Sequence, residues 1–283
     1  MNRTGRLDVL LLSAIVIAAV LSGCGKSNRT SSSGFGDGRL TLSGASTAAP
    51  LVNEIARRFE SRHPGVRIDV QTGGSSRGVA DVRRGTVDIG MVSRPLGSDE
   101  RDLTAHCIAM DGVALIVHRD NGVSELSRQQ IIDIYTGRID DWSAVGGRPA
   151  PITVVNKAEG RSTLELFLAH FKLKREDIHA DVVIGENLHG IRTVAGDPNA
   201  IGYVSIGTAE FERSNGVPIR LLPLDTIEAS TANVLNATFP LSRPLNLVTV
   251  GKRSPLVDAF IALATSKDVN DLVKAQFFVP IAE

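Results

Sequence analysis

Short apolar segments alternate with longer amphipathic ones after residue 38, and this alternation constrains the fold more than any other feature. The apolar segment "LTLS" at 40–43 has the length of a buried strand, and the following stretch Ala49–Arg62 repeats apolar residues at helical spacing. Such alternation is typical of a parallel sheet covered by helices, which predicts an α/β fold. The predicted strands and helices of the first half are, in order, 40–43, 49–62, 66–71, 79–84, 87–91 and 108–117.

The alternation begins again near residue 127, which predicts a second α/β lobe. We expect the final segment to return to the first lobe, so that lobe 1 comprises 39–117 plus 246–283 and lobe 2 comprises 118–245. The predicted elements of the second half are helices at 128–135, 164–171, 188–195, 256–264 and 269–276 and strands at 152–156, 200–207 and 245–250.

The stretch before residue 39 has the pattern of a secretory signal. Arg3 and Arg6 precede the apolar run Val9–Leu21, which is shorter than the about 20 residues of a membrane-spanning helix. The following "LSGC" resembles the bacterial lipobox, which implies cleavage before Cys24 and lipidation of its sulfur. We therefore expect a lipoprotein signal peptide at 1–23 and a flexible Gly/Ser-rich tether at 24–38. An ordinary signal peptide or a short anchor is the alternative.

Charge, cysteine and histidine content exclude several classes of function. Lys plus Arg and Asp plus Glu both number 31, so the net charge is zero and nucleic acid is not expected as a partner. Cys107 alone remains once Cys24 is lipidated, which leaves no internal disulfide. The histidines are scattered without metal-binding spacing, so we predict neither a metal nor a cofactor.

Four predicted strand ends carry Gly together with Ser or Thr, or Ser followed by Arg. In an open α/β sheet, ligands bind beyond the carboxyl ends of the strands, where helix N-termini offer free N–H groups and a partial positive charge. Several such ends together would form an oxyanion site. The alternative is that each hydroxyl merely caps its helix. The loops are 44–47 (GAST), 73–78 (GGSSRG), 92–94 (VSR) and 159–163 (EGRST).

The order of these motifs resembles that of the substrate-binding lipoproteins of bacterial ABC-type phosphate importers. The resemblance implies a two-lobed periplasmic-binding-protein fold of type II that closes over inorganic phosphate. It implies a monomeric receptor, lipid-anchored at a membrane in the periplasm or at the cell surface, that hands phosphate to an ABC permease and performs no bond chemistry. The matching motifs are SGAST, GGSSRG, VDIGMVSRPL, AMDGVALIV, IYTGRIDDWSAVGG, EGRST, AIGYVS and PLSRPLNL.

The resemblance carries phosphate-binding roles to particular residues. The family's fourth loop usually reads acid-Gly-Ser-Gly-Thr, with an arginine three residues before the first glycine. Here Arg161 replaces the first serine and Lys157 replaces the arginine, so either could be the cationic ligand, and we favour Arg161 because it can make a bidentate contact. The expected ligands are Ser46, Thr47, Ser75, Ser76, Ser93, Asp111, Arg161, Ser162 and Thr163, with Lys157, Arg77 and Arg94 as further candidates.

Asp111 needs an explanation of its own because it interrupts an apolar strand, where an unpaired carboxylate is costly. Some family members carry an aspartate after the third-loop serine that accepts the phosphate proton, and this chain has Ser93 followed by Arg94 there. Asp111 could take that role. Equally, it could cap the Gly112–Val113 backbone or pair with Arg94.

Two other functions compete with transport. Residues 74–78 (GSSRG) fit the Gly-x-Ser-x-Gly elbow of serine hydrolases, which would make Ser76 a nucleophile in need of a downstream histidine and acid. A lipid-anchored sensor of phosphate or another oxyanion would use the same fold without transport.

Overall fold

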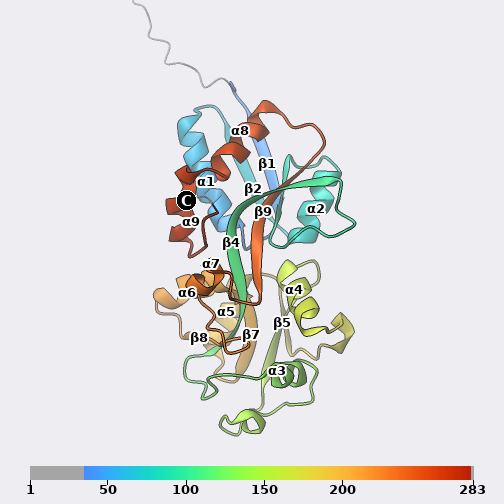
Figure 1. The fold of residues 1–283 in the computed structure, drawn as a ribbon, viewed down its shortest axis with the longest axis vertical. Helices are drawn as coiled ribbons and strands as arrows, with labels where there is room; N and C mark the ends of the chain where they lie inside the picture. Colours follow the sequence, from blue (N-terminus) through green and yellow to red (C-terminus); the bar gives the residue numbers. More distant parts are fainter. Residues whose placement is uncertain (1–34, 282–283) are drawn as a thin grey trace, which may run out of the picture.

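The computed structural model describes residues 35–281, so the predicted signal peptide and Cys24 lie outside the described residues. Figure 1 shows an elongated molecule with two lobes, and two long strands pass from one lobe to the other. The strands are β1 (Arg39–Gly44), β2 (Arg67–Thr72), β3 (Ile89–Val92), β4 (Leu103–His118), β5 (Thr153–Lys157), β6 (Val182–Ile184), β7 (Ala200–Ser205), β8 (Ile219–Leu221) and β9 (Ser242–Val250). The α-helices are α1 (Ala49–Arg62), α2 (Ser75–Arg83), α3 (Arg128–Tyr135), α4 (Ser162–Phe171), α5 (Asn187–Gly196), α6 (Ile206–Ser214), α7 (Thr231–Leu235), α8 (Pro255–Ala264) and α9 (Asn270–Ala275), with 3-10 turns η1 (Trp142–Val145), η2 (Arg175–Asp177) and η3 (Lys267–Val269).

The strands form a sheet that runs through both lobes in the order β2-β1-β3-β9-β4-β7-β5-β6, with β8 beside β4. β1 pairs in parallel with β2 and β3, and β5 pairs in parallel with β6 and β7. Between these parallel groups, β9 runs antiparallel to β3 and β4, and β4 runs antiparallel to β7. Each lobe therefore combines parallel strands with antiparallel partners from β4 or β9, which the predicted all-parallel pattern did not include.

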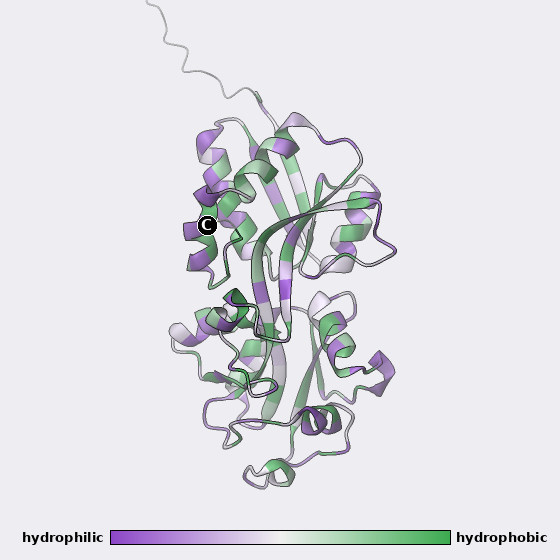
Figure 2. Ribbon diagram, viewed as in Figure 1, coloured by the Kyte–Doolittle hydropathy of each residue, from purple (hydrophilic) through white to green (hydrophobic). Residues whose placement is uncertain are grey.

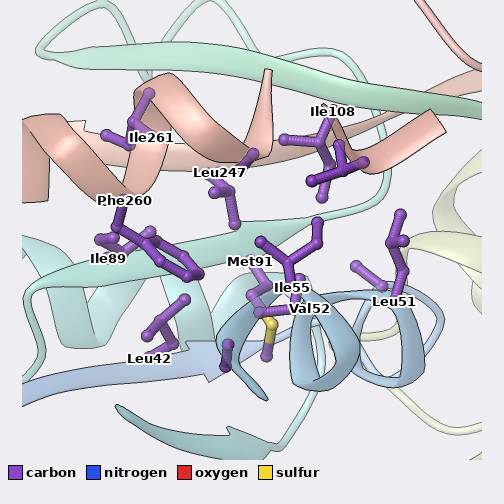
Figure 3. Packing of buried hydrophobic residues seen from close by; sticks show 14 of the residues in the cluster. Leu42, Leu51, Val52, Ile55, Ile89, Met91, Ile108, Leu247, Phe260 and Ile261 are labelled. Atoms are coloured by element: carbon purple, nitrogen blue, oxygen red, sulfur yellow. The ribbon is translucent and has the colours of Figure 1, made fainter. Parts of the chain in front are cut away.

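Each lobe has a hydrophobic core of its own. In the first lobe, α1 buries Leu51, Ile55 and Phe59 against the sheet, and each buried side chain contributes roughly 1.5–3 kcal/mol. Figure 3 shows this core, in which residues of α1 and α8 meet residues of the strands. In the second lobe, the rings of Phe167 and Tyr203 stack with centroids 4.1 Å apart.

Each of the two long strands, β4 and β9, passes from the hydrophobic core of one lobe to that of the other. Ala109 of β4 belongs to the first core and Val113 to the second. On β9 and the residue before it, Leu245 packs in the first core and Leu241 in the second. The predicted boundaries at 117/118 and 245/246 stay predictions, and this packing favours a crossover on β4 about six residues earlier. Figure 2 shows hydrophilic residues on β4 and β9 between the lobes.

Several element boundaries agree with the sequence pattern, and others do not. Helices α1 and α3 have the predicted bounds. Helix α2 begins at Ser75, four residues before the predicted start, because its polar first turn hid it from a pattern based on apolar spacing. The strand predicted at 200–207 ends at Ser205, which caps α6 by accepting a bond from the N–H of Thr208. No helix in residues 35–281 is long and apolar enough to cross a membrane.

Candidate functional site

A small cavity lies between the lobes, at the loops that the sequence singled out. Its volume is about 10 Å³, which is room for roughly one water molecule. All four predicted loops contribute to its lining, and Ser93 is the residue from the loop 92–94. The lining residues are Ala45, Ser46, Thr47, Gly74, Ser75, Ser93, Arg161, Ser162, Thr163, Gly185 and Asn187.

The helices that begin at this cavity have no side-chain cap. The N-cap residues of α1, α2, α4 and α5 are Ala48, Gly74, Arg161 and Glu186, and none accepts a bond through its side chain. By contrast, serine side chains cap α3, α6, α7 and α8, which begin elsewhere. The hydroxyls of Ser46 and Thr47 are therefore not caps. No N-cap side chain therefore satisfies the first-turn N–H groups of these four helices, and an anion suits such groups.

The serine hydroxyls of the two lobes bond to one another across the cavity. Ser162 Oγ of α4 lies 2.9 Å from Ser75 Oγ and 2.6 Å from Ser93 Oγ. Ser75 Oγ also accepts a bond from the N–H of Ser93 at 3.1 Å. All three side chains are buried, so these bonds satisfy groups that would otherwise be costly in the closed molecule. An oxyanion that enters the cavity would accept bonds from these hydroxyls in place of the bonds that they make to one another.

Arg243 is the functional candidate that the sequence analysis missed. It lies on β9 with no exposed surface and donates to Thr47 Oγ1 at 3.3 Å and to Thr163 Oγ1 at 3.2 Å. One guanidinium thus joins a threonine of each lobe. The sequence signal was an arginine beside the apolar run "PLNLVTV", within the quoted motif PLSRPLNL.

Asp111 is the partner of Arg243, and it does not pair with Arg94. The two residues lie opposite each other in the antiparallel pairing of β4 with β9. Asp111 Oδ2 accepts bonds from Arg243 Nη2 at 2.8 Å and Nε at 3.1 Å, and Oδ1 accepts from Ser205 Oγ and from the N–H of Gly207. The carboxylate neither lines the cavity nor caps Gly112–Val113, because protein donors occupy both its oxygens.

Arg161 lines the cavity, as the sequence predicts. Its Nη1 donates to Glu186 Oε1 at 2.8 Å, while its Nε is buried without a hydrogen-bond partner. A buried donor without an acceptor costs free energy, on the order of 1–3 kcal/mol. An anion in the cavity is a candidate for the missing acceptor.

Lys157 does not line the cavity but is bonded to Asn187, which does. Its side chain is buried, and Nζ donates to Asn187 Oδ1 at 3.0 Å, while Asn187 Nδ2 donates to Thr47 Oγ1 at 3.0 Å. Burial, together with the positive charges of Arg243 and Arg161, lowers the pKa of Lys157 from its usual 10.5 to about 7. The sequence analysis did not identify Asn187, whose amide links Lys157 to the cavity.

The remaining predicted ligands lie outside the cavity. Ser76 Oγ donates to Glu165 Oε1 at 3.0 Å, and Arg77 pairs with Asp81. Arg94 forms ion pairs with Glu100 at 2.7 Å and with Glu165 at 2.5 Å. Glu165 thus joins Arg94 and Ser76 of the first lobe to α4 of the second at the rim of the site.

The hydrolase and metal alternatives gain no support from the described residues. A serine nucleophile needs a histidine within hydrogen-bond reach, whereas within residues 35–281 the Ser76 hydroxyl bonds to Glu165 and to no histidine. The same residues contain no group of three or more His, Cys, Asp or Glu side chains able to hold a metal ion.

Comparisons with known proteins agree with this geometry. A family model described as a PBP superfamily domain matches residues 29–268. The phosphate-binding protein PstS of Bacillus subtilis is 28% identical over 288 residues, covering 98% of this chain and 94% of its own. A phosphate ABC transporter substrate-binding protein of Clostridium perfringens, solved with bound phosphate, superposes with a TM-score of 0.80 at 31% identity, covering 86% of this chain and 99% of its own. An ABC-type phosphate transport receptor of Vibrio cholerae superposes with a TM-score of 0.71 at 27% identity, covering 85% of this chain and 99% of its own.

The family match spans most of the chain, and the solved relatives share its two-lobed α/β architecture. The fold class predicted from the sequence and its likeness to the binding proteins of phosphate importers are thereby confirmed. The chain belongs to the PBP superfamily.

Proposed function

We propose that this protein is an extracytoplasmic receptor that binds inorganic phosphate between its lobes and delivers it to an ABC permease. The observation that carries the proposal is the cavity between the lobes, at which four helices without side-chain caps begin and whose lining threonines, Thr47 and Thr163, accept bonds from the buried guanidinium of Arg243. The names of the relatives in Bacillus, Clostridium and Vibrio support phosphate as the ligand.

Phosphate fits the donors of this site because its oxygens accept bonds from several directions at once. Arg243 and Arg161 would supply charge-assisted bonds. Ligand oxygens would then replace the bonds that Ser162 makes to Ser75 and Ser93. The hydroxyl donors proposed for the ligand are Ser46, Thr47, Ser75, Ser93, Ser162 and Thr163.

Asp111 has a different role in this proposal from that of a proton acceptor. Its oxygens already accept four bonds from protein donors, so it positions Arg243 and balances its charge. No carboxylate is among the residues that line the cavity in the described part of the chain. Sulfate would therefore meet no direct like-charge repulsion from the lining, and we expect it to bind, although more weakly than phosphate.

The cellular setting is part of the same proposal. A signal peptide at 1–23, lipidation at Cys24 and a tether at 24–38 would hold a monomeric receptor at the outer side of the cytoplasmic membrane. The receptor would perform no bond chemistry, because the ligand leaves as it arrives. The support is the "LSGC" pattern and the transport function named for the relatives.

Calorimetric titration of the stripped protein with phosphate and with sulfate tests the function. We expect saturable one-to-one binding of phosphate and a weaker response to sulfate. Thr163→Val should weaken phosphate binding by about 5- to 30-fold, because losing one hydroxyl contact to the ligand and to Arg243 costs roughly 1–2 kcal/mol.

Thr193→Val is the matched control, because the Thr193 hydroxyl bonds to the carbonyl of His189 within α5, away from the cavity. It should bind phosphate as the unmodified protein does. An absence of phosphate binding would overturn the proposed function. Equal affinity in Thr163→Val and Thr193→Val would remove Thr163 from the site.

A further inference from the structure

Lys157 is a buried amine whose surroundings do not match its charged form. An ammonium group has three donors, whereas the structure gives Lys157 Nζ one hydrogen-bond acceptor, Asn187 Oδ1. The side chain is 3% exposed, so water supplies little of the rest. Without an anion in the cavity, the neutral amine is the better fit, because an incompletely bonded buried charge is costly.

The charged groups around Lys157 lead to the same conclusion. Arg243 of β9 and Arg161 before α4 face it as cations, and Glu186 before α5 faces it as a carboxylate. Asp111 of β4 adds a second carboxylate through its pairing with Arg243. The neighbour from β7 is the uncharged Tyr203, whose hydroxyl accepts a bond from the Lys157 backbone N–H.

These groups form a cluster of two arginines and two carboxylates that is neutral when Lys157 is neutral. Protonated Lys157 would give this cluster one surplus buried positive charge. A phosphate dianion in the cavity would make the cluster negative while Lys157 is neutral. It would add two negative charges beside Asn187, the residue to which the amine is bonded. The chain of contacts runs from Lys157 through the Asn187 amide to Thr47, which lines the cavity.

We propose that Lys157 takes up one proton from the solvent when phosphate enters the cavity, so that anion binding and protonation are coupled. The inference rests on the proposed function, since it names how that same site responds to its ligand. Lys157 acts as a positioning residue that reaches the ligand's environment through Asn187. The balance is simple: the amine and a solvent proton give the ammonium, and the phosphate is unchanged.

The direction of the pKa shift supports this coupling. Burial lowers the pKa of Lys157 to about 7, and a nearby dianion would raise it. Above pH 7 the free protein then carries a neutral Lys157 that the bound protein protonates. By linkage, phosphate affinity falls as pH rises, by up to roughly tenfold per pH unit while the bound lysine stays protonated.

Lys157→Arg is the test variant, because arginine stays protonated in proteins and is the residue that the resembling family carries at this position. Phosphate is titrated calorimetrically into both proteins at pH 6 and pH 8, each in two buffers with different heats of ionisation, which gives the protons exchanged per phosphate. Protons exchanged by phosphate itself cancel in the comparison. Lys157→Met, neutral at every pH, is a second reference.

At pH 8 the unmodified protein should take up close to one more proton per phosphate than Lys157→Arg or Lys157→Met, and at pH 6 the difference should nearly vanish. Equal proton uptake in the unmodified protein and the variants at pH 8 would overturn the inference. If the variants fail to fold, sulfate, which exchanges no protons itself between pH 6 and pH 8, is titrated into the unmodified protein at pH 8, where uptake near one proton supports the coupling and zero uptake refutes it. No binding of phosphate by the unmodified protein would instead overturn the proposed function.

Discussion

Arg243 illustrates how a single residue can keep a buried charge ready for an anion. A fully buried guanidinium is stable only with good partners, and Asp111 provides them opposite it on β4. Nη1 and Nη2 of Arg243 also donate to Thr163 and Thr47, which line the cavity. Asp111 thus holds Arg243 in place, and under the proposed function Arg243 would bind the phosphate.

Arg243→Met should lower the free energy of unfolding by about 3–5 kcal/mol, because it leaves Asp111 as a buried charge without its ionic partner. The double variant Arg243→Met with Asp111→Asn should recover much of this loss, since both buried charges are then gone. Urea denaturation measures both effects.

Phosphate titration of the same double variant separates stability from binding. We expect a stable protein whose phosphate affinity is about 10- to 150-fold weaker, because a charge-assisted contact contributes about 1.5–3 kcal/mol and the hydroxyls of Thr47 and Thr163 lose their common donor. Unchanged affinity would show that Arg243 has no part in binding.

At the scale of elements, closure of the molecule depends on two loops that touch across the lobes. The loop between β2 and α2 places Gly74 against Gly160 of the loop between β5 and α4. The N–H of Ser76 donates to the Gly160 carbonyl at 3.4 Å, and the rim contacts of Glu165 lie beside it. Helices α2 and α4 can therefore bring their N-termini to one cavity only where these backbones meet closely.

Gly74→Ala should weaken phosphate binding by at least about tenfold, because an added Cβ would lie 2.5 Å from the carbonyl oxygen of Gly160 and oppose closure. Gly74 has φ of 96°, so the change also costs on the order of 1 kcal/mol of backbone strain.

Gly85→Ala is the control for replacing a glycine of positive φ, since Gly85 has φ of 67° and its added Cβ would meet no atom within 4 Å. Calorimetric titration should give the control the affinity of the unmodified protein. The same affinity in both variants would mean that the contact between Gly74 and Gly160 does not limit closure.

At the scale of the whole molecule, the lobes have separate cores and are joined through β4 and β9. Residues of β4 and β9 also build the buried pair at the junction. Motion of one lobe against the other therefore need not disturb either core. The lobes are closed on each other, and the cavity of about 10 Å³ is too small for phosphate unless the serines separate slightly.

Small-angle X-ray scattering of the stripped protein should give a larger radius of gyration than scattering of the phosphate-saturated protein. Without ligand, the closed form leaves uncapped helix ends and the buried Arg161 Nε without an acceptor, which favours opening. Gly74→Ala should stay expanded even with phosphate present. Identical scattering with and without phosphate would contradict a ligand-driven closure.

Local sequence patterns predicted much of the fold and part of the site. The apolar spacing of α1 and α3 was sufficient to predict their bounds. The prediction for α2 began four residues late because the first turn of this helix is polar. The glycine and hydroxyl loops were predicted from the sequence to lie together, and the structure brings Thr47, Ser75 and Ser162 to one cavity. Ser76 shares the second loop, but its side chain lies outside the cavity, and the loop sequence does not record this orientation.

The sequence by itself determined the α/β alternation, the two lobes and the kind of chemistry at the strand ends, because each depends on residues close together in the chain. Only the tertiary structure decided which charges meet. Asp111 and Arg243 are 132 positions apart, and their contact exists because β4 and β9 pair antiparallel in one register. The role of Lys157 likewise depends on an amide 30 positions away and on burial between four elements, since the protonation of a buried amine is set by everything that surrounds it.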